Sequence, residues 1–397
     1  MKKIILSVAV AAMALSTTAS ALEDIKVSGQ AKLWYETSDT DTLAGGNANG
    51  GDQDLFHKDS SGADIVFKLG MTGKQGNVGF GAEMTQVSTM GLENVLVSTT
   101  RNDEGGNPAA YVSKAYFTAP IAGATLKMGR QELNTPLLYT EKWNAVQNNF
   151  DAAVVIVPAT ADLTIIAAYA GQTNNGDVGP AWKAGANFNQ IGTQGSYALG
   201  AMYKTDDVGV NVWAYEVSGL ASAVWADAAL KAGPVAVKAY AGIVMPNGSG
   251  TGAGDDTTGF ALSAGMKTGP VNLFVAGSMM LEDGSIALAN FATGGKKTKL
   301  PTAGVYTDGV YIAQPDSVAV KLKASGKLGS TGLALQAVMN TNDTTASKET
   351  TEVDLIISQK LGDFKLKGIL MHRSFDLDAL DDTNGGIHAR VIASVNF

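Results

Sequence analysis

The sequence contains no cysteine, so neither disulfide bonds nor thiol chemistry is available to this protein. After residue 21, no apolar run approaches the 18 residues of a membrane-spanning helix. Proline is scarce, with 10 residues, whereas glycine is abundant, with 47. This balance suits a large sheet with many turns and bends, and it offers no membrane helix.

Basic residues are a minority too. Residues 1–21 have the form of a secretion signal: Lys2 and Lys3 precede an apolar run at 4–15, and small residues occupy 19–21. Its removal leaves 27 basic and 37 acidic side chains, a net charge of −10, which argues against nucleic acid as a partner. Residues 22–397 show no break in composition, so we expect one domain.

That domain reads as a series of short strands. About eighteen segments of roughly ten residues alternate apolar and polar side chains. Their connections alternate between short, as at 120–123 and 268–270, and long, as at 86–110, 131–149 and 280–316. The pattern predicts an all-β protein, a transmembrane antiparallel β-barrel of about 18 strands with short periplasmic turns and long external loops. The bacterial outer membrane, with its lipid and lipopolysaccharide, is the expected location.

The last strand shows the alternation clearly, because apolar side chains occupy every odd position from 387 to the terminal Phe397. One face therefore suits lipid and the other suits water, although a half-buried strand of a soluble sandwich is the alternative. On other strands we assign these residues to the lipid face: Val27, Ala31, Leu33 and Tyr35; Phe150, Ala152, Val154 and Ile156; Val318, Val320 and Leu322; Phe364, Leu366 and Leu370.

The opposite faces carry the cations. A mid-membrane lysine or arginine costs about 2–4 kcal/mol on the lipid face, so these side chains are placed toward a water-filled lumen. Such a basic wall lowers the barrier for anions and carboxylates, unless the lysines only solvate the wall without selecting solutes. The predicted wall comprises Lys114, Lys127, Lys321, Lys323, Lys365, Lys367 and Arg390, with Lys32, Lys68 and Lys238.

The loop at 131–149 is rich in large side chains for an exposed segment. Leu137, Leu138, Tyr139 and Trp143 need a surface to pack against. We therefore expect the loop to fold inward and narrow the lumen, because that arrangement buries these side chains.

The stretch Gly-Arg-Gln-Glu-Leu-Asn-Thr-Pro-Leu at 129–137 and Asn-Asn-Phe-Asp at 148–151 resemble the Campylobacter-type (epsilonproteobacterial) major outer-membrane porin family and the related basic-ladder specific porins. The resemblance implies an eighteen-stranded barrel, a third loop that forms the constriction, and a homotrimer. Carried over to this chain, it places Arg130, Glu132, Glu141 and Lys142 at the constriction. The alternative for Arg130 and Glu132 is an ion pair that anchors the loop. This chain departs from the family in having few lumen arginines.

The resemblance also implies calcium. Acidic side chains cluster at Asp376, Asp378, Asp381 and Asp382 and could supply oxygen ligands, but their spacing does not match an EF-hand loop. Solvated acids without a cofactor are therefore the preferred interpretation.

Together these features predict a porin through which ions and small hydrophilic solutes diffuse passively, with a mild preference for anions and carboxylates. An enzyme is not expected, because His57, His372 and His388 are far apart and none has metal-ligand spacing. The alternative is a non-channel surface protein, an adhesin or antigen, that binds partners through its long loops.

Overall fold

The computed structural model describes residues 22–39, 54–88, 90–92, 95–97, 109–174, 187–248, 254–342, 347–377 and 383–397. The strands are β1 (Glu23–Ser38), β2 (Ser61–Gln75), β3 (Val78–Ser88), β4 (Ala109–Ile121), β5 (Ala124–Gln131), β6 (Phe150–Pro158), β7 (Leu163–Thr173), β8 (Asn189–Gln190), β9 (Ser196–Lys204), β10 (Val208–Val217), β11 (Ala221–Ala232), β12 (Val235–Pro246), β13 (Thr257–Thr268), β14 (Val271–Met280), β15 (Ser317–Leu328), β16 (Thr331–Asn342), β17 (Ser347–Leu361), β18 (Phe364–Leu377) and β19 (Thr383–Asn396).

Short helical turns are found at η2 (Lys58–Ser60), η3 (Phe291–Thr293) and α2 (Gly309–Ile312). Among the described residues, no helix has the length and hydrophobicity needed to cross a bilayer.

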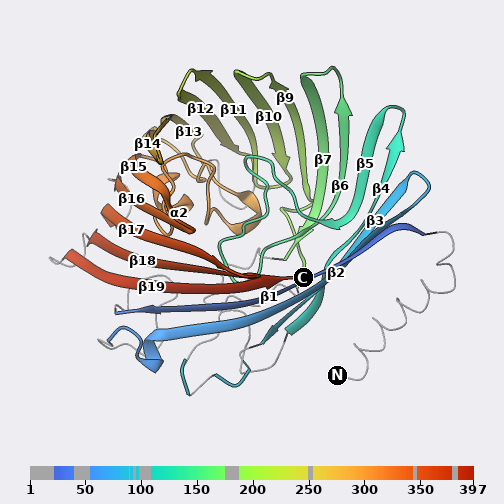
Figure 1. The fold of residues 1–397 in the computed structure, drawn as a ribbon. Helices are drawn as coiled ribbons and strands as arrows, with labels where there is room; N and C mark the ends of the chain where they lie inside the picture. The colour runs from blue at the N-terminus through green and yellow to red at the C-terminus, as the bar shows by residue number, and fades with distance from the viewer. Residues whose placement is uncertain are drawn as a thin grey trace.

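The strands form one closed antiparallel sheet. Each long strand pairs with the next along the chain, and β1 pairs with both β2 and β19, which closes the ring (Figure 1). The two-residue β8 pairs only with the end of β7, so eighteen of the described strands make up the wall. The predicted eighteen-stranded β-barrel is confirmed.

The barrel closes at its final residue. Gly29 N donates to the carbonyl oxygen of Phe397 at 2.7 Å, and Phe397 N donates to the carbonyl oxygen of Gly29 at 3.0 Å. A Cβ at position 29 would lie 2.2 Å from the Phe397 ring, so glycine leaves the space into which this ring packs. The ring also lies 6.1 Å, centroid to centroid, from that of Phe67 on β2.

The two ends of the barrel differ in the length of their connections. At one end, here the turn end, consecutive strands are joined by two to four residues, as at Ala122–Gly123 between β4 and β5. Ala122 and Gly123 both have positive φ, 48° and 83°, the geometry of a tight hairpin turn. The other end, here the loop end, carries the long connections, although 218–220 is a tight turn there too. The predicted sorting of short turns and long loops is confirmed.

The outer face is aliphatic. Val320, Leu322, Leu335, Met339 and Leu370 are all 48–62% exposed, and they lie on the strands β15, β16 and β18. Soluble monomers rarely expose apolar patches of more than a few hundred Å². This belt is suited to lipid, as predicted for Val318, Val320, Leu322, Phe364, Leu366 and Leu370.

On β6 the predicted faces are wrong. Phe150, Ala152, Val154 and Ile156 were assigned to lipid. The first three are buried in the apolar cluster inside the barrel, and Ile156 lies on the same inward face. The outward side chains are those of Ala153 and its neighbours in alternation, because Ala153 pairs with the exposed Met128. The reason is that loop residues fill this side of the lumen, so an apolar inward face has a protein surface to pack on.

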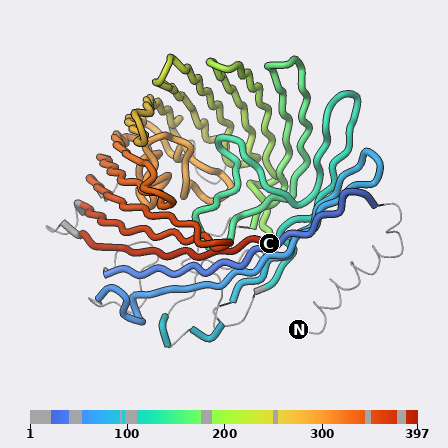
Figure 2. Tube along the Cα trace, in the orientation of Figure 1, coloured from blue at the N-terminus to red at the C-terminus, as the bar shows by residue number. Residues whose placement is uncertain are grey.

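Two connections fold into the barrel. The segments 132–149 and 281–316 lie within the ring of strands, where the teal and orange traces of Figure 2 approach each other. Their apolar side chains, including Leu137, Leu138, Leu288, Leu300 and Ile312, join the internal cluster. We expected 280–316 to be an external loop, and the structure corrects this expectation: Leu288, Ala289, Ala292 and Ile312 are at most 2% exposed.

Candidate pore constriction

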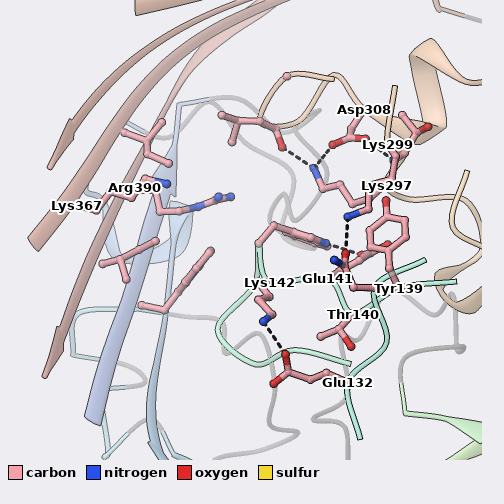
Figure 3. Close-up of a pocket in the computed structure, with 18 of the residues that line it drawn as sticks. Glu132, Tyr139, Thr140, Glu141, Lys142, Lys297, Lys299, Asp308, Lys367 and Arg390 are labelled. Atoms are coloured by element: carbon pink, nitrogen blue, oxygen red, sulfur yellow. Dashed lines mark hydrogen bonds and ion pairs between the residues drawn. The ribbon is translucent and has the colours of Figure 1, made fainter. Parts of the chain in front are cut away.

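A cavity of about 670 Å³ lies between the two inward segments and the barrel wall. Figure 3 shows Lys367 and Arg390 projecting from strands on one side, while Glu132, Glu141 and Lys142 project from the opposite side. Lys297, Lys299 and Asp308 of the second segment complete its polar lining. The lumen therefore narrows where loops and wall face each other.

The first segment, 132–149, is held by its apolar tip. Leu137 and Leu138 are 0% and 2% exposed, and Leu137 N donates to the Tyr215 hydroxyl of β10 at 3.3 Å. The tip turns back on itself because Thr135 Oγ1 donates to the Leu138 carbonyl at 2.7 Å. The large side chains singled out in the sequence thus anchor the loop against the far wall.

Glu141 joins the first segment to the second. Its Oε1 accepts hydrogen bonds from Asn290 Nδ2 at 2.9 Å and from the Thr293 hydroxyl, and its Oε2 accepts from Trp143 Nε1 at 2.6 Å. Burial raises the pKa of Glu141, although these donors oppose the shift. Because the side chain is buried and both oxygens are occupied, Glu141 acts as a brace between the loops.

Glu132 forms the lip of the cavity. Its carboxylate lies 2.6 Å from Lys142 Nζ and 2.6 Å from Lys114 Nζ of β4, and it accepts from Gln147 Nε2 at 2.6 Å. Burial alone raises the pKa of Glu132, but the two lysines outweigh burial and lower it to about 2. Lys142 is 65% exposed and reaches into the lumen from this pair.

The second segment is fixed to the wall by buried charges. Glu352 of β17 accepts from Tyr306 N at 3.0 Å and Thr307 N at 2.6 Å, and Lys321 of β15 donates to the Ala303 carbonyl. Within the segment, Lys297 and Asp308 form an ion pair at 3.0 Å. Burial raises the pKa of Asp308, although Lys297 opposes the shift.

Arg390 is part of a buried network on the opposite wall. Its Nε lies 3.0 Å from Glu36 Oε2, and its guanidinium lies 4.6 Å from the ring centroid of Trp34. The hydroxyl of Tyr306 donates to the same Glu36 at 3.2 Å and lies 3.1 Å from His388 Nε2. Arg390 therefore helps to position the second segment, and part of its own side chain lines the cavity.

Four lysines of the predicted basic wall, Lys68, Lys323, Lys365 and Lys367, have no ion pair, hydrogen bond or ring contact among the described residues. Of these, Lys323, Lys365 and Lys367 lie on inward positions of β15 and β18. Of the other members, Lys114 pairs with Glu83 and Glu132, Lys321 binds a carbonyl, and Lys127 lies over the Tyr116 ring at 4.1 Å. Lys238 pairs with Asp227, and Lys32 donates to the Asn144 carbonyl.

Lys297 and Lys299 were not predicted. Lys299 Nζ donates to Asn134 Oδ1 at 3.1 Å and lies 4.2 Å from the Tyr139 ring centroid, and burial lowers its pKa. A signal was present, because Lys296, Lys297 and Lys299 follow the apolar run 286–292. An apolar run that precedes a cationic cluster in a long loop indicates a segment that packs inward and presents charge.

Arg130 lies apart from the cavity. On β5, Arg130 lies on the same face as the exposed Met128 and on the opposite face from Lys127. Its side chain therefore points outward, near the loop end. Its Nε is 2.8 Å from Asp151 Oδ1, its Nη2 donates to Asp151 Oδ2 at 2.9 Å, and its guanidinium lies 3.4 Å from the Phe188 ring centroid. The structure therefore pairs Arg130 with Asp151, whereas Glu132 pairs with Lys114 and Lys142, so the ion pair between Arg130 and Glu132 that was the alternative is not formed.

No cluster of metal ligands occurs among the described residues. Of the acidic residues proposed as calcium ligands, Asp378, Asp381 and Asp382 lie outside the described residues.

The fold and this cavity define a closed β-barrel whose lumen is narrowed by two inward segments. No family model and no curated protein matches the sequence. Solved structures do match. OccK1 (OpdK) of Pseudomonas aeruginosa is 13% identical with a TM-score of 0.72, covering 94% of this chain and 98% of that one.

OccK9 (OpdG) of Pseudomonas aeruginosa is 12% identical with a TM-score of 0.75, covering 94% of this chain and 98% of that one. A BenF-like porin from Pseudomonas fluorescens is 12% identical with a TM-score of 0.72, covering 95% and 99%. OpdK has also been crystallised with vanillate. At this identity the likeness shows the fold.

Proposed function

We propose that this protein is an outer-membrane porin that lets ions and small hydrophilic solutes diffuse passively, with a mild preference for anions and carboxylates. The observation that carries the proposal is the constriction cavity inside a closed barrel, whose lining includes Lys299 and Lys367, two lysines without an ion pair among the described residues. A cation beside a narrow aqueous path attracts anions because the surrounding protein screens charge less than bulk water does. The transport needs no cofactor and no catalytic residue.

The structural likeness supports the broad class, and the finer assignments are part of the same proposal. We place the protein with the Campylobacter-type porins on the loop motif at 129–137. The aliphatic outer belt supports insertion in the outer membrane beside lipopolysaccharide. A homotrimer is proposed from the same resemblance, and light scattering of the detergent-solubilised protein, corrected for bound detergent, measures it.

Planar-bilayer recording of the purified protein tests the function. Stepwise conductance is expected, with a reversal potential in a salt gradient that reports anion preference. The triple variant Lys323→Gln, Lys365→Gln and Lys367→Gln removes three lumen cations that form no ion pair among the described residues, while retaining polar side chains. We expect its anion-to-cation permeability ratio to fall at least about twofold.

Lys58→Gln is the matched control, because it removes one lysine of the external turn η2 and leaves the lumen unchanged. If the purified barrel gives no conductance steps, the proposed porin function is wrong and the alternative of a non-channel adhesin gains support. If the triple variant and the wild type share one reversal potential, the channel stands but the basic wall does not set its selectivity.

A further inference from the structure

A second group of lysines lies on the lumen face at the turn end of β13–β18, outside the lining of the constriction cavity. Lys267 (β13), Lys327 (β15), Lys360 (β17) and Lys365 (β18) each lie next to the first or last residue of their strand. Their inward direction follows from alternation, because the adjacent Met266, Leu328, Leu361 and Leu366 are exposed apolar side chains of the outer face.

No acid balances this group. Within the described residues, none of the four lysines forms an ion pair. The inward side chains between Lys267 and Lys327 are those of Asn272 and Ser325, which are neutral. Lys360 and Lys365 are direct cross-strand partners, and like charges placed opposite each other destabilise a sheet. The arrangement is unfavourable unless a bound anion offsets it.

Two of the four lysines border a recess. A cavity of about 610 Å³ is lined by Lys267 and Lys327, with Asn272, Ser325 and Ser358 as its other polar side chains. Lys267 and Lys327 stand two strands apart and are offset by two residues along the strands, so their backbones are about 12 Å apart, a span that two extended lysine side chains can close on one ligand. Amide and hydroxyl groups of the floor can donate further hydrogen bonds to oxygen atoms.

We propose that this recess binds small multivalent oxyanions, molecules with two or more carboxylate or phosphate groups, which reach it from the turn end. The recess differs from the constriction, where Glu132, Glu141 and Asp308 offset the cations. Two ammonium groups with neutral donors between them match two separated anionic groups better than they match a single monovalent anion. The side-specific part of the proposal depends on the porin function, whereas binding itself does not.

Calorimetric titration of the detergent-solubilised full-length protein with tripolyphosphate tests binding. The variant Lys267→Gln with Lys327→Gln is expected to lose at least about tenfold in affinity. Lys204→Gln with Lys231→Gln is the matched control, because it removes two inward lysines at the same end, on β9 and β11, outside the recess. We expect it to change affinity less than twofold, a difference assigned to general electrostatics.

Unheated electrophoresis shows whether each variant remains a folded barrel, and the single variants Lys267→Gln and Lys327→Gln should each show part of the loss. Equal losses in the recess and control pairs would overturn the proposal, because net charge would then suffice. No measurable binding by the wild type would overturn it as well.

Side-specific block in a planar bilayer tests the access route. Tripolyphosphate added to the turn side should reduce the wild-type current at concentrations at least about tenfold lower than on the loop side, and the recess pair should abolish this difference. Equal block from both sides overturns the access route. If the protein binds tripolyphosphate in calorimetry but gives no conductance, the anion-binding recess is supported and the porin function is refuted.

Discussion

Asn290 and Glu141 are hydrogen bonded at 2.9 Å across 149 residues of sequence, and this bond ties the two inward segments to each other. Each segment also has its own attachment to the wall, through Leu137 and Tyr215 in one case and Lys321 and Ala303 in the other. The constriction is therefore a braced structure, whose polar lining is held in place by bonds between the two segments and from each segment to the wall.

Glu141→Ala removes the brace. The donors of Asn290, Thr293 and Trp143 then lose their partner, at about 1–3 kcal/mol for each one that stays buried. We expect faster proteolysis of the internal segments and noisier, larger single-channel currents, measured on the same preparation. Glu282→Ala is the control, because Glu282 lies exposed in the second segment. Quiet currents of wild-type size in the Glu141 variant would contradict the brace.

The Glu132 bridge sets an acid limit. The pKa of Glu132 in the folded protein is about 2, below its usual value of 4.5. A depressed carboxyl pKa stabilises the fold fully above about 4.5, and this contribution is lost as the pH falls through about 2. Conductance that depends on this lip should stay constant from pH 7 to 5 and change mainly below pH 4. In Glu132→Gln that acid step should be absent, and a step that persists would locate the titrating group elsewhere.

Lys321 and Lys367 should give different phenotypes, although the sequence places both on the basic wall. Lys321 donates to the Ala303 carbonyl, so Lys321→Gln should loosen segment 281–316, raise current noise and lower the unfolding temperature. Lys367 faces the cavity without an ion pair among the described residues, so Lys367→Gln should shift the reversal potential toward cations at little cost in stability. Thermal unfolding in detergent and bi-ionic recording separate the two effects, and identical behaviour of the two variants would refute this division.

Arg130 should matter to the outer surface and not to the pore. Its ion pair with Asp151 is partly exposed, so a double-mutant cycle of Arg130→Gln and Asp151→Asn should give a coupling of about 0–1 kcal/mol. The reversal potential of Arg130→Gln should equal that of the wild type. A change in reversal potential similar to that of Lys367→Gln would show that Arg130 does contribute to the constriction.

Alternation and turn chemistry made the barrel predictable from sequence. Side chains on a strand point to opposite faces whatever the tertiary context, so the outward Val320 and Leu322 and the inward Lys321 and Lys323 follow from spacing alone. Tight turns at residues such as Gly123 mark the hairpins equally well. The inward fold of 131–149 was expected because its large apolar side chains need burial.

Face assignment failed where the lumen is not filled with water. On β6 the apolar positions 150, 152 and 154 look like a lipid face, but they pack on the inward segments. Alternation separates the two faces of a strand. It does not indicate which face is inside the barrel when lipid covers one face and apolar loop residues cover the other. For the same reason the inward fold of segment 281–316 was not predicted. Its apolar residues Leu288 and Ile312 are evident in the sequence, but the sequence does not show which surface they pack against.

The sequence by itself determined an acidic, cysteine-free chain of about eighteen amphipathic strands, because composition and period-two patterning act locally. Only the tertiary structure decided which cations stay unpaired, since Lys321, Lys367 and Arg390 look alike in one dimension. Their partners, the Ala303 carbonyl for Lys321 and Glu36 for Arg390, come from distant segments that meet when the sheet closes and the loops enter it. Electrostatic environment depends on that three-dimensional proximity, and spacing along the chain does not encode it.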